Sequence, residues 1–113
     1  MSQPVTRKDL LKAILDSDKS ISTVEVKEVT MGPNQKAPLH LHPCPTVGAI
    51  TAGTISFQIA GKSVQLLKAG DAFYEPANVR VAKFDNDTDA PARFVVFYLL
   101  GKNEYDTVRI LTE

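Results

Sequence analysis

The chain has 113 residues and a mass of 12.3 kDa, with 43% hydrophobic residues, 23% charged residues, and thirteen basic side chains against thirteen acidic ones. This length and composition fit one globular domain and exclude a disordered or collagen-like protein. A net charge of zero lacks the positive field that binding to a phosphate backbone requires, so nucleic acid is not an expected partner.

The sequence also bears on location. The longest apolar run, Phe94–Leu100, has seven residues, whereas a membrane-spanning helix needs about 18. The first eleven residues lack the hydrophobic stretch and the cleavage pattern of a secretory signal. Cys44 is the only cysteine, so no internal disulfide can form. We therefore expect a cytoplasmic protein without a membrane partner.

The first predicted element lies near the N-terminus. Thr6 and Asp9 resemble a helix capping box, and the apolar residues at positions 10, 11, 14 and 15 form one helical stripe. A strand through Lys12–Leu15 is the alternative. We expect residues 1–20 to form an N-terminal arm or short helix, and residues 21–113 to form a single barrel domain.

Strand patterns dominate from residue 21 onward. Val24 and Val26 share one parity while Val29 and Met31 share the other, which predicts a bulge within one long strand. Further on, short alternating segments cover residues 55–59, 64–66 and 79–81, and they are separated by Gly, Asn and Asp turns. Many short strands at this spacing indicate an all-β barrel or sandwich.

The run Phe94–Leu100 does not alternate. Such a run, rich in β-branched and aromatic residues, indicates a strand that is covered on both faces. One face would meet the domain core. In so small a domain a second subunit is the natural cover for the other face, so we expect a homodimer.

His40-Leu41-His42 contains both histidines of the chain. Residues two apart in a strand point to the same face, so both imidazoles could converge on one metal ion. The spacing alone is weak evidence, because without further context ordinary half-buried histidines are the simpler interpretation.

The surroundings of the histidines resemble the cupin superfamily, whose first motif reads G-x5-H-x-H-x3-4-E-x6-G and whose second reads G-x5-P-x-G-x2-H-x3-N. The resemblance covers the chain from about Val24 to Leu100, with the short inter-motif segment of small single-domain bacterial cupins. It rests on residues at matching separations, namely His40, His42, Gly53, Gly70, Asp71 and Pro76. It implies a double-stranded β-helix, or jelly roll, with a pocket for a small molecule in the barrel.

The departures from the motifs concern the metal site. Thr46 stands where the family places its glutamate, Val81 where it places the third histidine, and Asn78 where the second motif has a glycine. Zinc sites in enzymes usually have three protein ligands, and a common non-haem iron site has two histidines and a carboxylate. His40 and His42 are therefore the predicted ligands of a reduced site that could hold Zn, Fe, Ni or Mn, or no metal at all.

Other side chains could complete such a site. Glu75, Asp71 and Gln58 are the nearest oxygen donors in motif order, and Cys44 is a candidate thiolate. Gln58 has the parity of the face opposite the apolar one, Asp71 reads more simply as a turn residue, and Cys44 more simply as a small buried hydrophobe.

Glu75 and Tyr74 are the candidates for proton transfer. An ion pair of Glu75 with Arg80, and core packing of Tyr74, are the structural alternatives. The functional prediction is a small cupin that binds a small molecule beside a two-histidine metal site, with no specific reaction assigned. The alternatives are a metal-free binding or regulatory module and metal-free acid–base catalysis.

Overall fold

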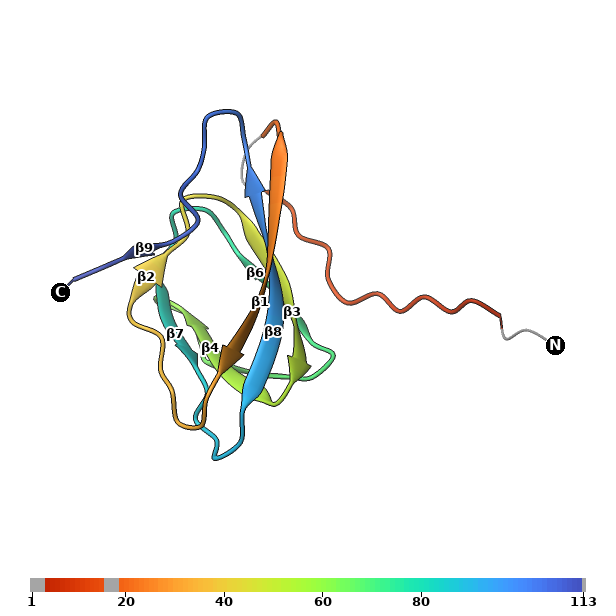
Figure 1. Cartoon of the computed structure of the whole chain (residues 1–113), viewed down its shortest axis with the longest axis vertical. Coiled ribbons are helices and arrows are strands. Elements are labelled where there is room, and N and C mark those ends of the chain that lie inside the picture. The colour runs from red at the N-terminus through yellow and green to blue at the C-terminus, as the bar shows by residue number, and fades with distance from the viewer. Residues whose placement is uncertain (1–3, 16–18, 113) are drawn as a thin grey trace.

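The computed structural model describes residues 4–15 and 19–112 of the chain. This part of the chain folds into two antiparallel sheets that face each other (Figure 1). Its strands are β1 (Thr23–Met31), β2 (His40–Leu41), β3 (Thr46–Ala52), β4 (Thr54–Ile59), β5 (Gln65–Lys68), β6 (Ala72–Glu75), β7 (Val81–Asp85), β8 (Ala92–Leu100) and β9 (Arg109–Ile110). One sheet has the order β1-β8-β3-β6 and the other the order β5-β4-β7-β2-β9, which confirms the predicted all-β jelly roll.

The core lies between the inner faces of the two sheets. Burial alternates strictly along strand β8, and its buried positions are Ala92, Phe94, Val96, Tyr98 and Leu100. Four phenylalanines from four strands (Phe57, Phe73, Phe84 and Phe94) pack with ring centroids 4.9 to 6.2 Å apart. Aromatic rings at these separations contribute packing beyond the area they bury.

The turn before β4 requires a glycine. Gly53 has a φ of +77°, and a Cβ at this position would lie 2.6 Å from the Pro91 carbonyl oxygen. Both the backbone conformation and the close approach of residue 91 exclude a side chain.

The predicted N-terminal helix is absent from residues 4–15, and so is the alternative strand through Lys12–Leu15. Leu10, Leu11 and Ile14 are 54%, 46% and 77% exposed, so the predicted apolar stripe finds little surface to pack on. An isolated helix of this length is marginal in water without such packing. Instead the segment is an extended arm, which borders the outer face of β3 and β8 through residues 8–13 and whose N-terminal end points away from the barrel (Figure 1). No helix in the described residues is long and apolar enough to span a membrane.

The predicted bulge in the first strand is also wrong. β1 pairs with β8 in one continuous register from Thr23 opposite Leu100 to Met31 opposite Ala92. Val24 and Val26 point away from the barrel and are 51% and 53% exposed, while Met31 is buried inside it. The change of parity therefore marks two apolar faces of one regular strand.

Candidate metal centre

The two histidines enter the barrel from strand β2 and the residue just after it. His40 pairs with Val81 on β7 and with Ile110 on β9, so β2 is held from both sides. Both imidazoles are buried, with ring centroids 5.0 Å apart and ring planes nearly perpendicular. The spacing of two residues along an extended chain thus brings both rings to the same cavity, as predicted.

A backbone carbonyl fixes the proton of each ring. His40 Nδ1 lies 2.7 Å from the Pro38 carbonyl oxygen, and His42 Nδ1 lies 2.6 Å from that of Thr107. A carbonyl oxygen only accepts, so each Nδ1 carries a hydrogen and donates it. In the neutral ring this leaves the lone pair on Nε2, which is the arrangement found in histidines that ligate metals.

Glu75 supplies a carboxylate to the same place. It is the last residue of β6 and lies directly opposite Thr46 on β3, the position where the family places its glutamate. His40, His42 and Glu75 are all buried, and one ligand atom of each lies within 4.8 Å of the others. The missing carboxylate is therefore replaced from the neighbouring strand, and these three residues are positioned to bind a metal ion.

The Glu75 carboxylate is incompletely satisfied without an ion. Its Oε2 lies 2.5 Å from His42 Nε2. With His42 neutral and its hydrogen on Nδ1, this oxygen is, among the described residues, the one fully buried side-chain oxygen or nitrogen that has no hydrogen-bond partner. A buried carboxylate oxygen in this state is costly unless a proton or a cation lies beside it. Two imidazole nitrogens and this oxygen form the donor set of many divalent metal sites.

The same contact shifts the basicity of His42. Burial by itself lowers the pKa of His42, but the adjacent Glu75 carboxylate and the Thr107 carbonyl outweigh it and raise this pKa above 6.5. In the metal-free protein a proton thus favours the position between the two side chains. A metal ion would compete with that proton for the same atoms.

The three residues line a cavity of about 300 Å³. Its wall is mainly apolar, and the apolar side chains include Met31, Phe84, Phe94 and Val96. Val81 stands at the position of the third histidine in the cupin motif. It is fully buried opposite His40, and its side chain has no atom that can ligate a metal.

The sequence analysis missed Tyr98, which also lines this cavity. Its ring lies 5.6 Å from that of His42. Burial, reinforced by the charge of Glu75, raises the pKa of Tyr98 to about 12, so the phenol keeps its proton at neutral pH. Tyr98 shares the parity of the buried Phe94 and Val96, but the run of apolar residues in β8 does not reveal from the sequence which parity faces the cavity.

The other sequence candidates lie elsewhere. Tyr74 is on the opposite face of β6 from Glu75 and lines a different groove, with Pro43 and Asn78. Arg80 is exposed, and the buried ion pair of Glu75 is with His42. Gln58 donates a hydrogen bond to the Lys62 carbonyl, 2.8 Å away. Asp71 accepts one from the Lys68 amide at 2.8 Å, which is the turn role expected for it.

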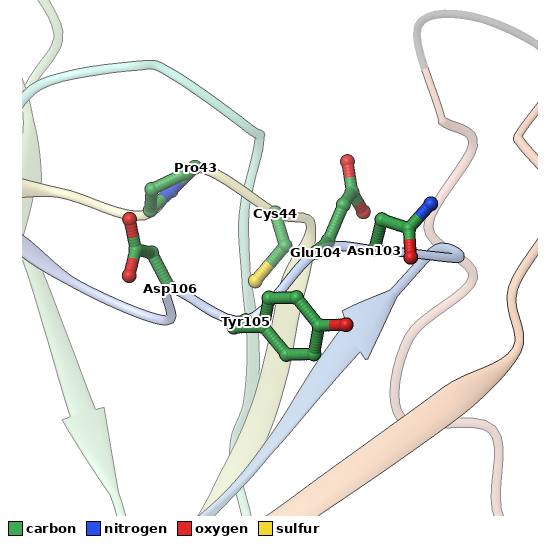
Figure 2. A pocket seen from close by; sticks show the side chains of 6 residues that line it. All are labelled: Pro43, Cys44, Asn103, Glu104, Tyr105 and Asp106. Atoms are coloured by element: carbon green, nitrogen blue, oxygen red, sulfur yellow. The ribbon is translucent and has the colours of Figure 1, made fainter.

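Cys44 is buried and stays outside the metal-ligand group. Its side chain points towards the segment between β8 and β9, beside Tyr105 (Figure 2). Burial raises the pKa of its thiol, which disfavours the thiolate that a metal or an electrophile needs. The simpler interpretation, a small buried hydrophobe, fits this position.

Comparison with known proteins places this geometry in a family. The model of the cupin domain matches residues 27–98, which is more than half of the chain. No curated protein matches the sequence.

Solved structures share the fold at low sequence identity. An oxalate oxidase in complex with the substrate analogue glycolate matches at a TM-score of 0.66 and 21% identity, over 78% of this chain and 46% of its own. The DMSP lyase DddQ from Ruegeria pomeroyi DSS-3 matches at 0.66 and 21%, over 77% and 42%. A cupin-like protein from Thermotoga maritima matches at 0.65 and 21%, over 78% and 64%. This chain thus spans less than half of the oxidase and of the lyase, and identity at this level shows the fold alone.

Proposed function

Because this chain belongs to the cupin family, we propose that it holds a divalent metal ion through His40, His42 and Glu75 and binds a small organic molecule beside it. The observation that carries the proposal is the convergence of His40, His42 and Glu75, which are all buried and offer one ligand atom each within 4.8 Å of the others. The Nδ1 atom of each histidine is anchored to a backbone carbonyl, which leaves Nε2 free to ligate an ion.

The donor set is compatible with several divalent metals. Two imidazoles and one carboxylate are typical of non-haem iron, and they also suit zinc, manganese and nickel. When bound, such an ion polarises an oxygen of the ligand as a Lewis acid. The proposal therefore favours ligands with carboxylate, carbonyl or hydroxyl oxygens.

The chain's own residues complete the pocket. The neutral Tyr98 phenol provides a hydrogen-bond donor on the cavity wall, and the apolar side chains exclude water around it. Of the two residues considered for proton transfer, Glu75 faces the cavity, and it is the candidate base in the metal-free alternative, because in the metal-bound protein its carboxylate is a ligand. Tyr74 could act only on a molecule bound at the other face of β6.

Metal content per chain tests the proposal. Untagged protein purified without chelator is expected to carry close to one metal ion per chain by elemental analysis. His40→Ala and Glu75→Gln should each lose most of it, because the first removes a ligand nitrogen and the second replaces the carboxylate by a neutral amide, which binds these ions poorly. Tyr74→Phe is the matched control, since it changes the neighbouring residue on the opposite face. Undiminished metal in both ligand variants would disprove the site.

A metal-free binding module is the second candidate function. The mainly apolar wall favours it, as does the aliphatic Val81 opposite His40. In that case the wild-type protein holds no metal, and chelator-treated protein keeps its ligand affinity without turnover. Metal-free acid–base catalysis would instead give a bell-shaped pH–rate profile that chelators leave unchanged.

We further propose that the protein acts in the cytoplasm as a homodimer, with a small molecule rather than nucleic acid as its ligand. The single buried cysteine suits a reducing compartment. The dimer is supported by β8, whose outward positions Val95, Phe97 and Leu99 are as apolar as its inward ones.

A further inference from the structure

We propose that the small molecule bound in the cavity is an organic acid whose carboxylate pairs with Lys36 and Gln35 at the cavity mouth, while its uncharged end lies beside Tyr98. This inference rests on the proposed function, because it names the chemical class of the ligand for the same cavity. It assigns Lys36 as the residue that selects for a negative charge.

The cavity has a polar mouth and an apolar interior. Lys36, Gln35 and Thr30 are exposed and mark the mouth, whereas Phe94 and Val96 are buried and belong to the interior. A ligand that fills the cavity therefore extends from polar side chains at the solvent to apolar walls inside. This arrangement suits a molecule with one charged end and an apolar body.

Lys36 is the one lysine or arginine among the described residues that line the cavity, and it forms no ion pair with any of them. Two acidic residues nearby are engaged elsewhere. Asp85 pairs with Lys36 through the backbone, and its carboxylate accepts from the Ala37 amide at 3.2 Å. The hydrogen bond with Lys83 is the main cause that lowers the pKa of Asp87, and the charge of Lys36 is the smallest one. The Lys36 ammonium can therefore bind an anion without first breaking an ion pair.

The chain on either side of the mouth is fixed before a ligand binds. The Gln35 carbonyl accepts from the backbone amide of Asn86 at 2.9 Å, and the Gln35 side-chain Oε1 accepts from the Gly32 amide at 2.8 Å. The NH2 group of this side chain is left to donate. Together with the Lys36 ammonium it provides donors for the two oxygens of a carboxylate. Donors that are already oriented lose less conformational entropy on binding.

The charges in the cavity also favour an anion. Glu75 supplies the one carboxylate among the described lining residues, and His42 or a bound cation compensates it. With a divalent ion on two neutral imidazoles and one carboxylate, one positive charge is left over. Lys36 adds a further positive charge at the mouth. The field of the filled site thus attracts an anionic ligand and repels a cationic one.

Desolvation sets the orientation of the ligand. A carboxylate inside the apolar interior would lose its hydration, whereas a carboxylate at the mouth keeps part of it. The uncharged end then meets Tyr98, whose hydroxyl makes no hydrogen bond within the described residues. This hydroxyl can donate to a hydroxyl or carbonyl oxygen of the ligand. A hydroxy acid or keto acid with an apolar body matches both ends of this cavity of about 300 Å³.

Calorimetric titration of the untagged full chain with matched acids and amides tests the ligand class. The probes are 4-hydroxybenzoate and 4-hydroxyphenylacetate, each compared with its uncharged amide. Wild type should bind at least one acid with a dissociation constant below about 1 mM, and at least about threefold more tightly than the amide. Lys36→Glu should weaken binding of the acid at least about tenfold and leave that of the amide unchanged, because it places like charges together.

Lys62→Glu is the matched control, since it reverses the charge of another exposed lysine that does not line the cavity. It should bind acid and amide as wild type does. Lys36→Met serves as the second variant if Lys36→Glu does not fold, and it should abolish the preference for the acid. Failure of both acids to bind at about 1 mM would overturn the inference. Equal affinities for acid and amide in wild type would do the same, as would an acid affinity that neither Lys36 variant changes.

Chelator-treated protein separates this inference from the proposed metal site. Lys36 and Gln35 do not belong to the metal-ligand group, so the preference for the acid should persist after the metal is removed. A wild type that holds no metal but keeps this preference would overturn the metal site alone. A wild type that holds the metal but binds acid and amide equally would overturn the ligand class alone.

Discussion

At the scale of single residues, the buried polar groups of the cavity differ in how they are neutralised. The negative charge of the Glu75 carboxylate is compensated by His42 or by a bound cation. Tyr98 needs no such compensation, because burial and the nearby Glu75 carboxylate both oppose ionisation and keep the phenol neutral. Because its pKa differs between the folded and the unfolded chain, Tyr98 makes the stability of the protein depend on pH, and the substitution Tyr98→Phe removes this dependence.

Tyr98→Phe should reduce the loss of stability at high pH. The pKa of Tyr98 is about 12 in the folded protein, above its ordinary value of 10.0. Below pH 10 the phenol is neutral in both states and contributes no pH dependence. Between pH 10 and 12 the unfolded chain loses the proton first, so the folded protein is destabilised, by about 1.4 kcal/mol at pH 11.

Urea unfolding of wild type and Tyr98→Phe at pH 8 and pH 11 measures this contribution. From pH 8 to pH 11, the free energy of unfolding of wild type should fall by about 1.4 kcal/mol more than that of Tyr98→Phe. Lysine and arginine titration is common to both proteins and cancels. An equal loss in both proteins would show that Tyr98 ionises normally.

At the scale of elements, the connection between β7 and β8 is fastened to the end of β1. Asn86 is fully buried, and its side-chain amide donates to the carbonyl oxygens of Gly32 and Ala90 at 2.9 and 2.7 Å, and more weakly to that of Met31 at 3.3 Å. Its Oδ1 accepts from the Thr88 hydroxyl at 2.7 Å. Asn86-Asp87-Thr88 has the spacing of a glycosylation site, but this side chain is a structural link.

Asn86→Ala should destabilise the fold by about 3 kcal/mol, because it removes a fully buried amide that donates to the Met31, Gly32 and Ala90 carbonyls and accepts from Thr88, at about 1 kcal/mol for each hydrogen bond. Thr88→Ala is the control, since it removes a hydroxyl from the same connection but keeps the amide, and it should cost about 1 kcal/mol or less. Chemical unfolding of the two variants against wild type gives both values. A loss below about 1 kcal/mol in Asn86→Ala would show that water satisfies these carbonyls.

At the scale of the whole molecule, the metal site joins the two sheets. Glu75 belongs to the β1-β8-β3-β6 sheet, while His40 belongs to the other sheet. His42 is oriented by Thr107, which precedes β9. An ion bound to all three residues would therefore link distant parts of the chain, and its binding would stabilise the fold as a whole.

Adding metal to chelator-treated protein should raise its melting temperature. At a free metal concentration of 100 times the dissociation constant, binding to the folded state adds about 2.7 kcal/mol, or roughly 10 °C for a domain of this size. Calorimetry with zinc or manganese should show this shift in wild type and in Tyr74→Phe. Glu75→Gln should show little of it, and an equal shift in that variant would place the ion elsewhere.

Several strands and the histidine pair could be predicted from the sequence, because the period of apolar residues and the spacing of motif residues are local properties of the chain. The alternation of residues 55–59 predicted β4, and the two-residue spacing of the histidines placed both rings on one face. The bulge predicted from the parity change between Val26 and Val29 was wrong. The period of apolar residues alone cannot distinguish a bulge from a regular strand with two apolar faces. The capping pattern at Thr6 misled as well, since helix formation there depends on tertiary packing.

The sequence by itself determined the jelly roll, the histidine pair and the apolar character of both faces of β8. The tertiary structure alone decided that Glu75 takes the place left by Thr46, because the two residues are 29 positions apart and meet only through strand pairing. It also decided that Tyr98 faces the cavity while Tyr74 faces away. Chemistry at a site depends on which side chains converge in space, and that is set by the register between strands rather than by order along the chain.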